Sequence, residues 1–183
     1  MISYELILSS TILIVIFCAG SFRYSSIIEA QGAVWYGVPL APVLLLFMIS
    51  AVCELARAPA DLQEAESELV AGFFTEAGAS VFVSSFLGEY VNIVAMSTIM
   101  ASLFFGGYSA PNFFGSFGGL SFAAVIIGLK TCIGCFLVVW VRAVLPRFTF
   151  IGLLTACWTY LLPLTIALLL FFPAMLVAFD ATV

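Results

Sequence analysis

Long apolar runs dominate the chain, and short polar stretches separate them. Each run is about 20 residues long, enough for a helix rising about 1.5 Å per residue to cross a hydrocarbon core of about 30 Å. The strands of membrane barrels alternate over only about 10 residues, so a barrel does not fit. The pattern predicts an all-α, polytopic membrane helical bundle, one membrane domain over residues 1–183, with about five transmembrane helices at about 4–22, 36–53, 81–105, 120–141 and 150–172.

An acidic segment, at about residues 54–78, joins the second and third predicted helices. It holds more than half of the ten acidic residues of the chain: Glu54, Asp61, Glu64, Glu66, Glu68 and Glu76. Arg57 follows Glu54 by three positions, so the two side chains can pair on one helical face. Any function is expected to centre on this segment.

Pro59 predicts the end of the second helix, because the residue before a proline disfavours the helical conformation. The same proline can begin a new helical segment. In that segment Asp61, Glu64 and Glu68 would lie on one side. Glu66 would project roughly opposite them.

Two further acids fall within predicted helices, where a charge at bilayer depth costs about 2.5–3.5 kcal/mol. Glu5 opens the first helix, and it can also be interpreted as an interfacial acid that complements the helix dipole. Glu89 lies deeper, inside the third helix. Ser85, Asn92 and Met96 follow it at helical spacings of three and four, which predicts a polar stripe facing other helices.

Lys130 lies near the middle of the fourth predicted helix. A lysine at that depth can extend its side chain toward the interface, or it can face a partner acid or a hydrated cavity. Glu89 is a possible partner.

Carboxylates that lie close together resist simultaneous ionisation, so some of them can hold and pass protons near neutral pH. A proton relay is therefore one interpretation of the acidic segment. A cation site would need the same acids, and a solvated acidic amphipathic helix would need no partner at all. The residues alone leave these three possibilities open.

Composition restricts the chemistry further. The chain is 64% hydrophobic and 8% charged, with a formal net charge of -5, which argues against binding nucleic acid. It contains no histidine, which excludes imidazole ligation of haem or zinc and every His-dependent triad in this chain. Free thiols in apolar runs act as small hydrophobic groups, so packing is the preferred role for Cys18, Cys53, Cys132, Cys135 and Cys157.

The arginines suggest how the chain is oriented. With five crossings, Arg57, Arg142 and Arg147 fall on the side of the acidic segment, whereas Arg23 falls on the other. The positive-inside rule then places the acidic segment in the cytoplasm or, in an organelle, in the matrix. The C-terminus is expected on the opposite face.

The acidic segment also resembles a known motif, that of subunit 1 of the proton-pumping NADH:ubiquinone oxidoreductase, respiratory complex I. The match runs without a gap over Glu54, Arg57, Ala58, Pro59, Asp61, Leu62, Glu64, Glu66, Ser67, Glu68, Leu69, Val70, Gly72 and Phe73. Shorter pieces agree in order along nearly the whole chain: Ile2 to Glu5, Glu89-Tyr90, Trp140 to Ala143, Pro146-Arg147, Trp158 and Leu162 to Leu164.

This resemblance implies a non-redox membrane subunit of an H⁺-translocating NADH:ubiquinone reductase. It implies a quinone-cavity loop made by Arg57, Ala58, Pro59, Asp61, Glu64, Glu66, Glu68 and Phe73. It implies a proton path through Glu5, Glu54, Asp61, Glu64, Glu66, Glu68 and Glu89, in which Arg57 is the counter-charge. Glu76, Arg142 and Arg147 would support the loop or an interface.

The same resemblance implies ubiquinone as the substrate, with no flavin, haem, metal or iron–sulfur ligands in this chain. The expected partners are other complex I subunits, including those of the hydrophilic arm at the quinone site, and the lipid bilayer. The expected location is the mitochondrial inner membrane, with the acidic segment in the matrix and the C-terminus in the intermembrane space.

Three departures from the family pattern concern charges and length. Thr149, Ile151 and Thr159 stand where the family usually has charged residues. The chain resembles only the C-terminal part of the family protein. We expect a protein made as two chains, with a companion membrane chain that carries the N-terminal helices and packs against the first helix; a fragment of a longer chain is the alternative.

Two other function classes use similar residues. A secondary transporter or ion channel could use the acids as a cation site, although no inverted repeat supports it. The membrane-bound hydrogenase subunit that is related to the complex I subunit is the other class.

Overall fold

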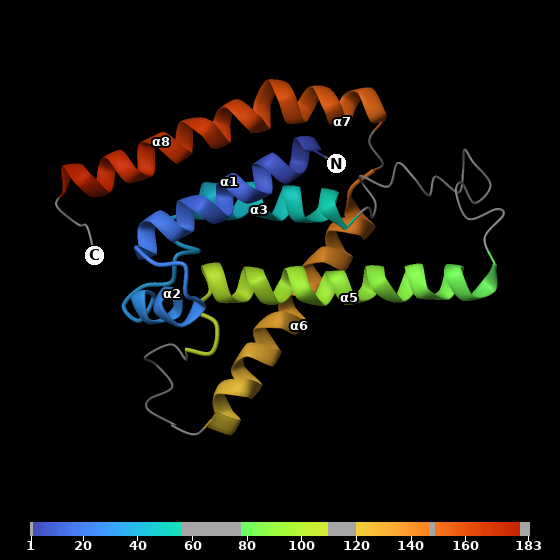
Figure 1. Ribbon diagram of the computed structural model, residues 1–183, viewed down its shortest axis with the longest axis horizontal. Coiled ribbons are helices and arrows are strands. Elements are labelled where there is room, and N and C mark those ends of the chain that lie inside the picture. Colours follow the sequence, from blue (N-terminus) through green and yellow to red (C-terminus); the bar gives the residue numbers. More distant parts are fainter. Residues whose placement is uncertain (1, 56–77, 110–119, 147–148, 180–183) are drawn as a thin grey trace.

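The computed structural model describes residues 2–55, 78–109, 120–146 and 149–179 (Figure 1). All regular structure in these ranges is helical. The helices are α1 (Ile2–Ala19), α2 (Tyr24–Ala30), α3 (Ala41–Glu54), α5 (Ala79–Phe104), α6 (Leu120–Val144), α7 (Phe150–Ala156), the π-helical turn η3 (Cys157–Leu161) and α8 (Leu162–Ala178).

Among the described residues, four helices are long and apolar enough to cross a membrane: Ile2–Ala19, Ala79–Phe104, Phe122–Val144 and Phe150–Ala178. They correspond to the first, third, fourth and fifth predicted helices. The prediction of an all-α, polytopic membrane protein is confirmed. The last of these helices runs past its predicted end at 172, through Pro173, to Ala178.

The second predicted helix is shorter than expected. α3 has 14 residues, about 21 Å at 1.5 Å per residue, which is less than the thickness of a hydrocarbon core. The apolar residues Tyr36 to Leu40, assigned to this helix from hydropathy, instead form a turn. The backbone N–H of Gly37 in this turn donates a hydrogen bond of 2.8 Å to the carbonyl of Phe104, so tertiary pairing replaces helical pairing. The short helix α2 lies in the segment predicted as a loop.

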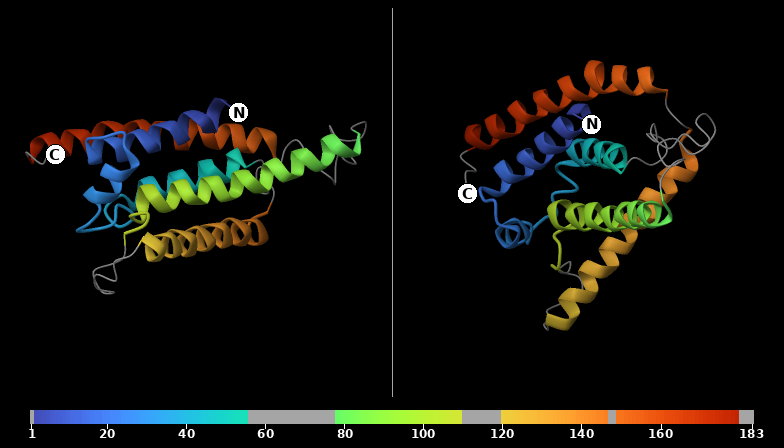
Figure 2. Two further views of the ribbon diagram at one scale, coloured as in Figure 1. Left: turned by 60° about the horizontal axis from the view of Figure 1, so that its bottom comes forward. Right: turned by 45° about the vertical axis from the view of Figure 1, so that its right-hand side comes forward.

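The helices stack in three layers (Figure 2). α1 and α8 form one outer layer, α3 and α5 the middle layer, and α6 the other outer layer. The buried core lies between α1, α3 and the C-terminal half of α5, where the rings of Phe47 and Phe104 pack with centroids 5.4 Å apart. In a bilayer such contacts are stabilised mainly by close packing, because lipid tails are as apolar as the side chains.

α6 packs closely against α5 and crosses it at a steep angle (Figure 1). Gly134 of α6 lies against Ser97 and Met100 of α5, so the two backbones approach closely at that point. Lys130 of α6 lies beside Phe105, where α5 has just ended. Residues 120–129 of α6, about 15 Å of helix, precede this contact in the chain.

A buried glutamine fixes the C-terminal end of α5. Gln31 follows α2 and is only 1% exposed. Its Nε2 donates to the carbonyls of Ser102 and Leu103 at 3.2 and 3.0 Å. Its Oε1 accepts a 2.9 Å hydrogen bond from the N–H of Gly106. These bonds pair backbone groups that the end of a helix leaves unsatisfied.

Candidate functional site

The described part of the candidate site lies at one end of the bundle, where α1 begins and α3 ends. α1 and α3 pack against each other in opposite directions (Figure 1), which places Glu5 of the first turn of α1 close to Glu54, the last residue of α3. The charges of the two carboxylates interact, and the Tyr4 phenol interacts with both. Glu5 is exposed within this chain and Glu54 is half-buried. The fold therefore groups two acids from different helices at the start of the acidic segment.

The helix dipole favours an acid at Glu5 but not at Glu54. A carboxylate in the first turn of a helix is favoured by the helix dipole, which suits Glu5. A carboxylate at the C-terminal end, such as Glu54, is disfavoured, typically by about 0.3–1 kcal/mol. A second acid placed nearby adds repulsion to that cost. Local rules that are broken in this way are expected at functional sites.

A third element holds this end of the bundle together. The indole Nε1 of Trp158 in η3 donates a 3.0 Å hydrogen bond to Oγ of Ser3, two residues before Glu5. Beside it Cys53 of α3 and Cys157 of η3 are both buried and carry free thiols, which agrees with a packing role for these two, whereas Cys132 of α6 is exposed within this chain. The acidic end is thus fixed by α1, α3 and η3 together.

An apolar cavity of about 490 Å³ adjoins the same end of α3. Its wall includes Val52 and Cys53, which directly precede Glu54, together with Val141 of α6 and Tyr160 of η3. A cavity of this size and lining suits an apolar ligand or ligand tail, and polar groups at its edge could orient the head of such a ligand.

Glu89 lies on α5, away from the first two acids. Ser85, Glu89, Asn92 and Met96 are all half-buried, so the predicted stripe shares one side of the helix. One carboxylate oxygen of Glu89, Oε2, is buried. Measured along the helices from the contact of Phe47 with Phe104, Glu89 lies roughly 12 Å farther than Glu54. Glu54 and Glu89 are therefore separated along the bundle. Glu54 is the first residue of the acidic segment, and Glu89 follows the end of that segment, in α5.

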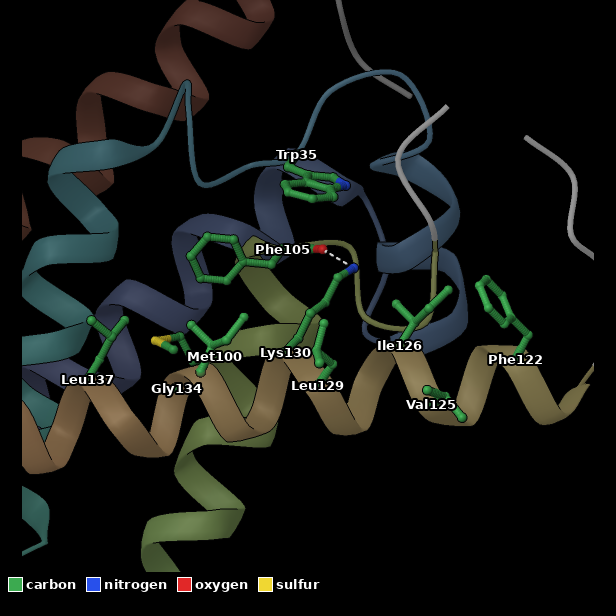
Figure 3. A pocket seen from close by; sticks show the side chains of 11 residues that line it. Trp35, Met100, Phe105, Phe122, Val125, Ile126, Leu129, Lys130, Gly134 and Leu137 are labelled. Atoms are coloured by element: carbon green, nitrogen blue, oxygen red, sulfur yellow. Dashed lines mark hydrogen bonds between the residues drawn. The ribbon is translucent and has the colours of Figure 1, made fainter. Parts of the chain in front are cut away.

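The suggested pairing of Lys130 with Glu89 is wrong. Lys130 Nζ donates to three backbone carbonyls, those of Phe105, Gly107 and Ser109, at 2.7, 2.8 and 2.8 Å (Figure 3 draws the first). Glu89 precedes Phe105 on the same helix by about 24 Å. The partner that the lysine needs at this depth is backbone, not an acid.

The remaining predicted site residues divide into two groups. Arg142 lies in the last turn of α6 and is exposed, where a cation complements the helix dipole. The others fall outside the described residues: Arg57, Ala58, Pro59, Asp61, Glu64, Glu66, Glu68, Phe73, Glu76 and Arg147. Their roles stay predictions.

Two residues of the structure have no role in the sequence interpretation. The sequence pattern places Gln31 in a polar loop, although it is buried and ties that loop to α5. The same pattern assigns nothing to Trp35, although its ring lies 4.8 Å from Lys130 Nζ. A glutamine next to a tryptophan-containing apolar turn is the signal that could have suggested both.

Comparison with known proteins decides the family. A family model described as NADH dehydrogenase matches residues 1–173. The chain belongs to the NADH dehydrogenase family. This membership confirms the resemblance inferred from the motif around Glu54.

Relatives within the NADH dehydrogenase family carry related names. The chain is 49% identical over 182 residues to NADH-ubiquinone oxidoreductase chain 1 of Mycosarcoma maydis, covering 98% of this chain and 55% of that protein. It is 43% identical over 194 residues to the protein of the same name from Yarrowia lipolytica, covering 99% and 57%. A bacterial relative, an NADH-quinone oxidoreductase subunit of Rhodospirillum centenum, is 41% identical over 180 residues, covering 98% and 53%. The chain spans about half the length of these relatives.

Proposed function

We propose that the chain is a membrane subunit of the proton-translocating NADH:ubiquinone oxidoreductase, where it helps to form the ubiquinone cavity and couples quinone reduction to proton movement. The observation that carries the proposal is the packing of α1 on α3 in opposite directions, which places Glu5 near Glu54 at the point where the acidic segment leaves α3. Family membership and the relatives' names supply the reaction.

The acids act as proton carriers in this proposal. Glu5 and Glu54 lie at the same end of the bundle, where the charge of Glu5 acts on Glu54, and in the proposal they begin the path. The acids Asp61, Glu64, Glu66 and Glu68 continue the path along the acidic segment, and Glu89 receives it on α5. Arg57 supplies the counter-charge that limits the repulsion.

Ubiquinone is the substrate in the proposal. The apolar cavity beside Val52 and Cys53 suits an isoprenoid tail, while Arg57, Ala58, Pro59 and Phe73 belong to the loop that meets the quinone. The chain has no histidine. In the proposal it binds no flavin, haem or iron–sulfur cluster, so electrons reach the quinone from another subunit.

The proposed partners are the other complex I subunits. They include the hydrophilic-arm subunits at the quinone site, which Glu76, Arg142 and Arg147 help to contact. The proposed location is the mitochondrial inner membrane, with the acidic segment and Arg142 on the matrix side according to the positive-inside rule.

The test replaces Glu64, Glu66 and Glu68 by Gln, singly and together, in the assembled enzyme. A second set replaces Glu5 and Glu54. We expect quinone-linked NADH oxidation and the accompanying proton pumping to fall, while NADH oxidation by an artificial acceptor that takes electrons upstream stays unchanged. The upstream activity shows that the redox centres are intact.

Glu29→Gln is the matched control, because Glu29 is an exposed acid on α2, beyond the C-terminal end of α1 from Glu5. It removes the same charge without touching the acidic end. Normal quinone reductase activity in an assembled enzyme that lacks Glu64, Glu66 and Glu68 would refute the site assignment. Loss of activity in Glu29→Gln as well would show that net charge, rather than the proposed path, is responsible.

A further inference from the structure

Three backbone carbonyls converge on one point between α5 and α6. They belong to Phe105, Gly107 and Ser109, and each lies 2.7 or 2.8 Å from Lys130 Nζ. Lys130 is the single lysine of the chain. An ammonium group has three N–H donors and no acceptor, so three carbonyls satisfy it completely.

The backbone conformation at Gly106 and Gly107 determines where these carbonyls point. Gly106 and Gly107 have φ angles of 70° and 47°, in the left-handed region that glycine adopts without strain. A Cβ atom at Gly107 would lie 2.6 Å from Cδ1 of Ile28, so a larger residue would have to displace that side chain. The turn that directs the carbonyls toward one point therefore depends on this glycine pair.

An aromatic ring closes the fourth side. The Trp35 ring lies 4.8 Å from Nζ, within the range of cation–π attraction, and it packs edge-to-face on Phe105. Figure 3 shows the indole above the lysine and Phe105 beside it. Gln31 holds the opposite wall by binding the N–H of Gly106. Residues from two separate segments, 31–35 and 105–109, thus form a cage around the ammonium.

The cage discriminates between cations by shape. A guanidinium is planar and its N–H donors lie in that plane, so it cannot direct three N–H groups at carbonyls on one side as a tetrahedral ammonium does. A quaternary ammonium has no N–H to donate. Carbonyls that replace the hydration shell of a cation are the device used by selectivity filters at membrane depth.

We propose that the carbonyls of Phe105, Gly107 and Ser109, with the face of Trp35, form a binding site for a primary ammonium group, which Lys130 fills in the native chain. An apolar cavity of about 500 Å³ is lined by Trp35, Phe105 and Lys130 themselves and continues along α6. It gives a small alkylammonium both a route to the site and room for its alkyl chain. The ammonium joins α6 to the end of α5. This proposal does not depend on the function proposed above.

The experiment uses Lys130→Ala in the full-length chain, within the membrane complex reconstituted in lipid. The thermal unfolding midpoint is measured against increasing n-butylammonium at constant ionic strength. Loss of three charge-assisted hydrogen bonds should lower the midpoint by roughly 10 °C. n-Butylammonium should restore at least half of the loss, and the effect should saturate.

Tetramethylammonium, guanidinium and potassium are the comparison cations and should restore little. Cys132→Ala, an exposed position two residues along α6, should show neither the loss nor the response. A destabilised variant that n-butylammonium does not stabilise, or that potassium stabilises equally well, overturns the proposal. A midpoint unchanged by Lys130→Ala overturns it also.

A second measurement needs no variant and covers the case in which Lys130→Ala does not fold. In the native protein, reductive methylation should leave Lys130 unmodified, because its three N–H groups are engaged. In the denatured chain the same lysine should react fully, as peptide mass spectrometry can show. Equal modification of Lys130 in the native and denatured protein would overturn the proposal.

Discussion

Gly134 lets α6 approach α5 closely, and replacing it tests whether that contact holds the two helices together. A Cβ atom at Gly134 would lie 2.9 Å from Cε of Met100 and 3.0 Å from Cβ of Ser97. The methionine end can swing aside, but Cβ of Ser97 moves only with the backbone of α5. Gly134→Ala should therefore force the helices apart.

Two opposing terms set the magnitude. Overpacking of a tight contact costs about 1–3 kcal/mol. Alanine in place of glycine inside a helix contributes about 1 kcal/mol in the favourable direction. Gly134→Ala should therefore change the free energy of unfolding by between about zero and 2 kcal/mol, in the destabilising direction.

Gly128 provides the control on the same helix. No heavy atom lies within 4 Å of a Cβ placed there, so Gly128→Ala gains the helical preference without any clash. The difference between the two variants, about 1–3 kcal/mol, isolates the packing cost. It corresponds to a difference of roughly 2–12 °C in unfolding midpoint for a chain of this size.

The assay is thermal unfolding of the reconstituted protein followed by tryptophan fluorescence. Gly134→Leu and Gly128→Leu extend the series, and the larger side chain should widen the gap between the two positions. Equal midpoints for Gly134→Ala and Gly128→Ala would refute the reasoning, because the contact with Ser97 would then carry no cost.

Three further substitutions test other contacts. Gln31→Leu should destabilise the protein by about 1–3 kcal/mol in thermal unfolding, because it leaves the N–H of Gly106 without its acceptor; an unchanged midpoint would contradict this. Gly107→Ala should be destabilising through both its positive φ and its contact with Ile28. Ile28→Val in the same chain removes Cδ1 but keeps Cγ1, which lies 3.0 Å from the added Cβ, so it should recover only part of the contact cost and none of the backbone cost. Thr149→Ala should cost about 1 kcal/mol, since Thr149 accepts the N–H of Gly152 at the start of α7, whereas Thr149→Ser should cost little.

Hydropathy alone located the long helices well, because each places a continuous apolar run in the membrane. It misjudged the start of α3 for a physical reason. Tyr36 to Leu40 are as apolar as a helix interior, but Gly37 pairs with Phe104 across the fold, and no local pattern reveals a partner 67 residues away.

The candidate site was predictable in part. The motif around Glu54 and the acid at Glu5 suggested one site, and the antiparallel packing of α1 on α3 brings the two acids together. Lys130 shows what the sequence pattern could not predict. Its depth indicated that it needed a partner, but the partner is backbone, and backbone carbonyls are the same at every position of a sequence.

The hydrogen bond between Ser3 and Trp158 joins residues 155 positions apart. At a synthesis rate of about 5–20 residues per second, the ribosome needs roughly 8–30 s to reach the second residue after making the first. During that time α1 has neither α8 nor η3 to pack against. Glu5, in the first turn, is the only charged residue of α1. The rest of the helix can therefore contact lipid, without its protein neighbours, at little cost in free energy. The face of α1 that α8 and η3 cover is thus completed only when the last part of the chain has been made.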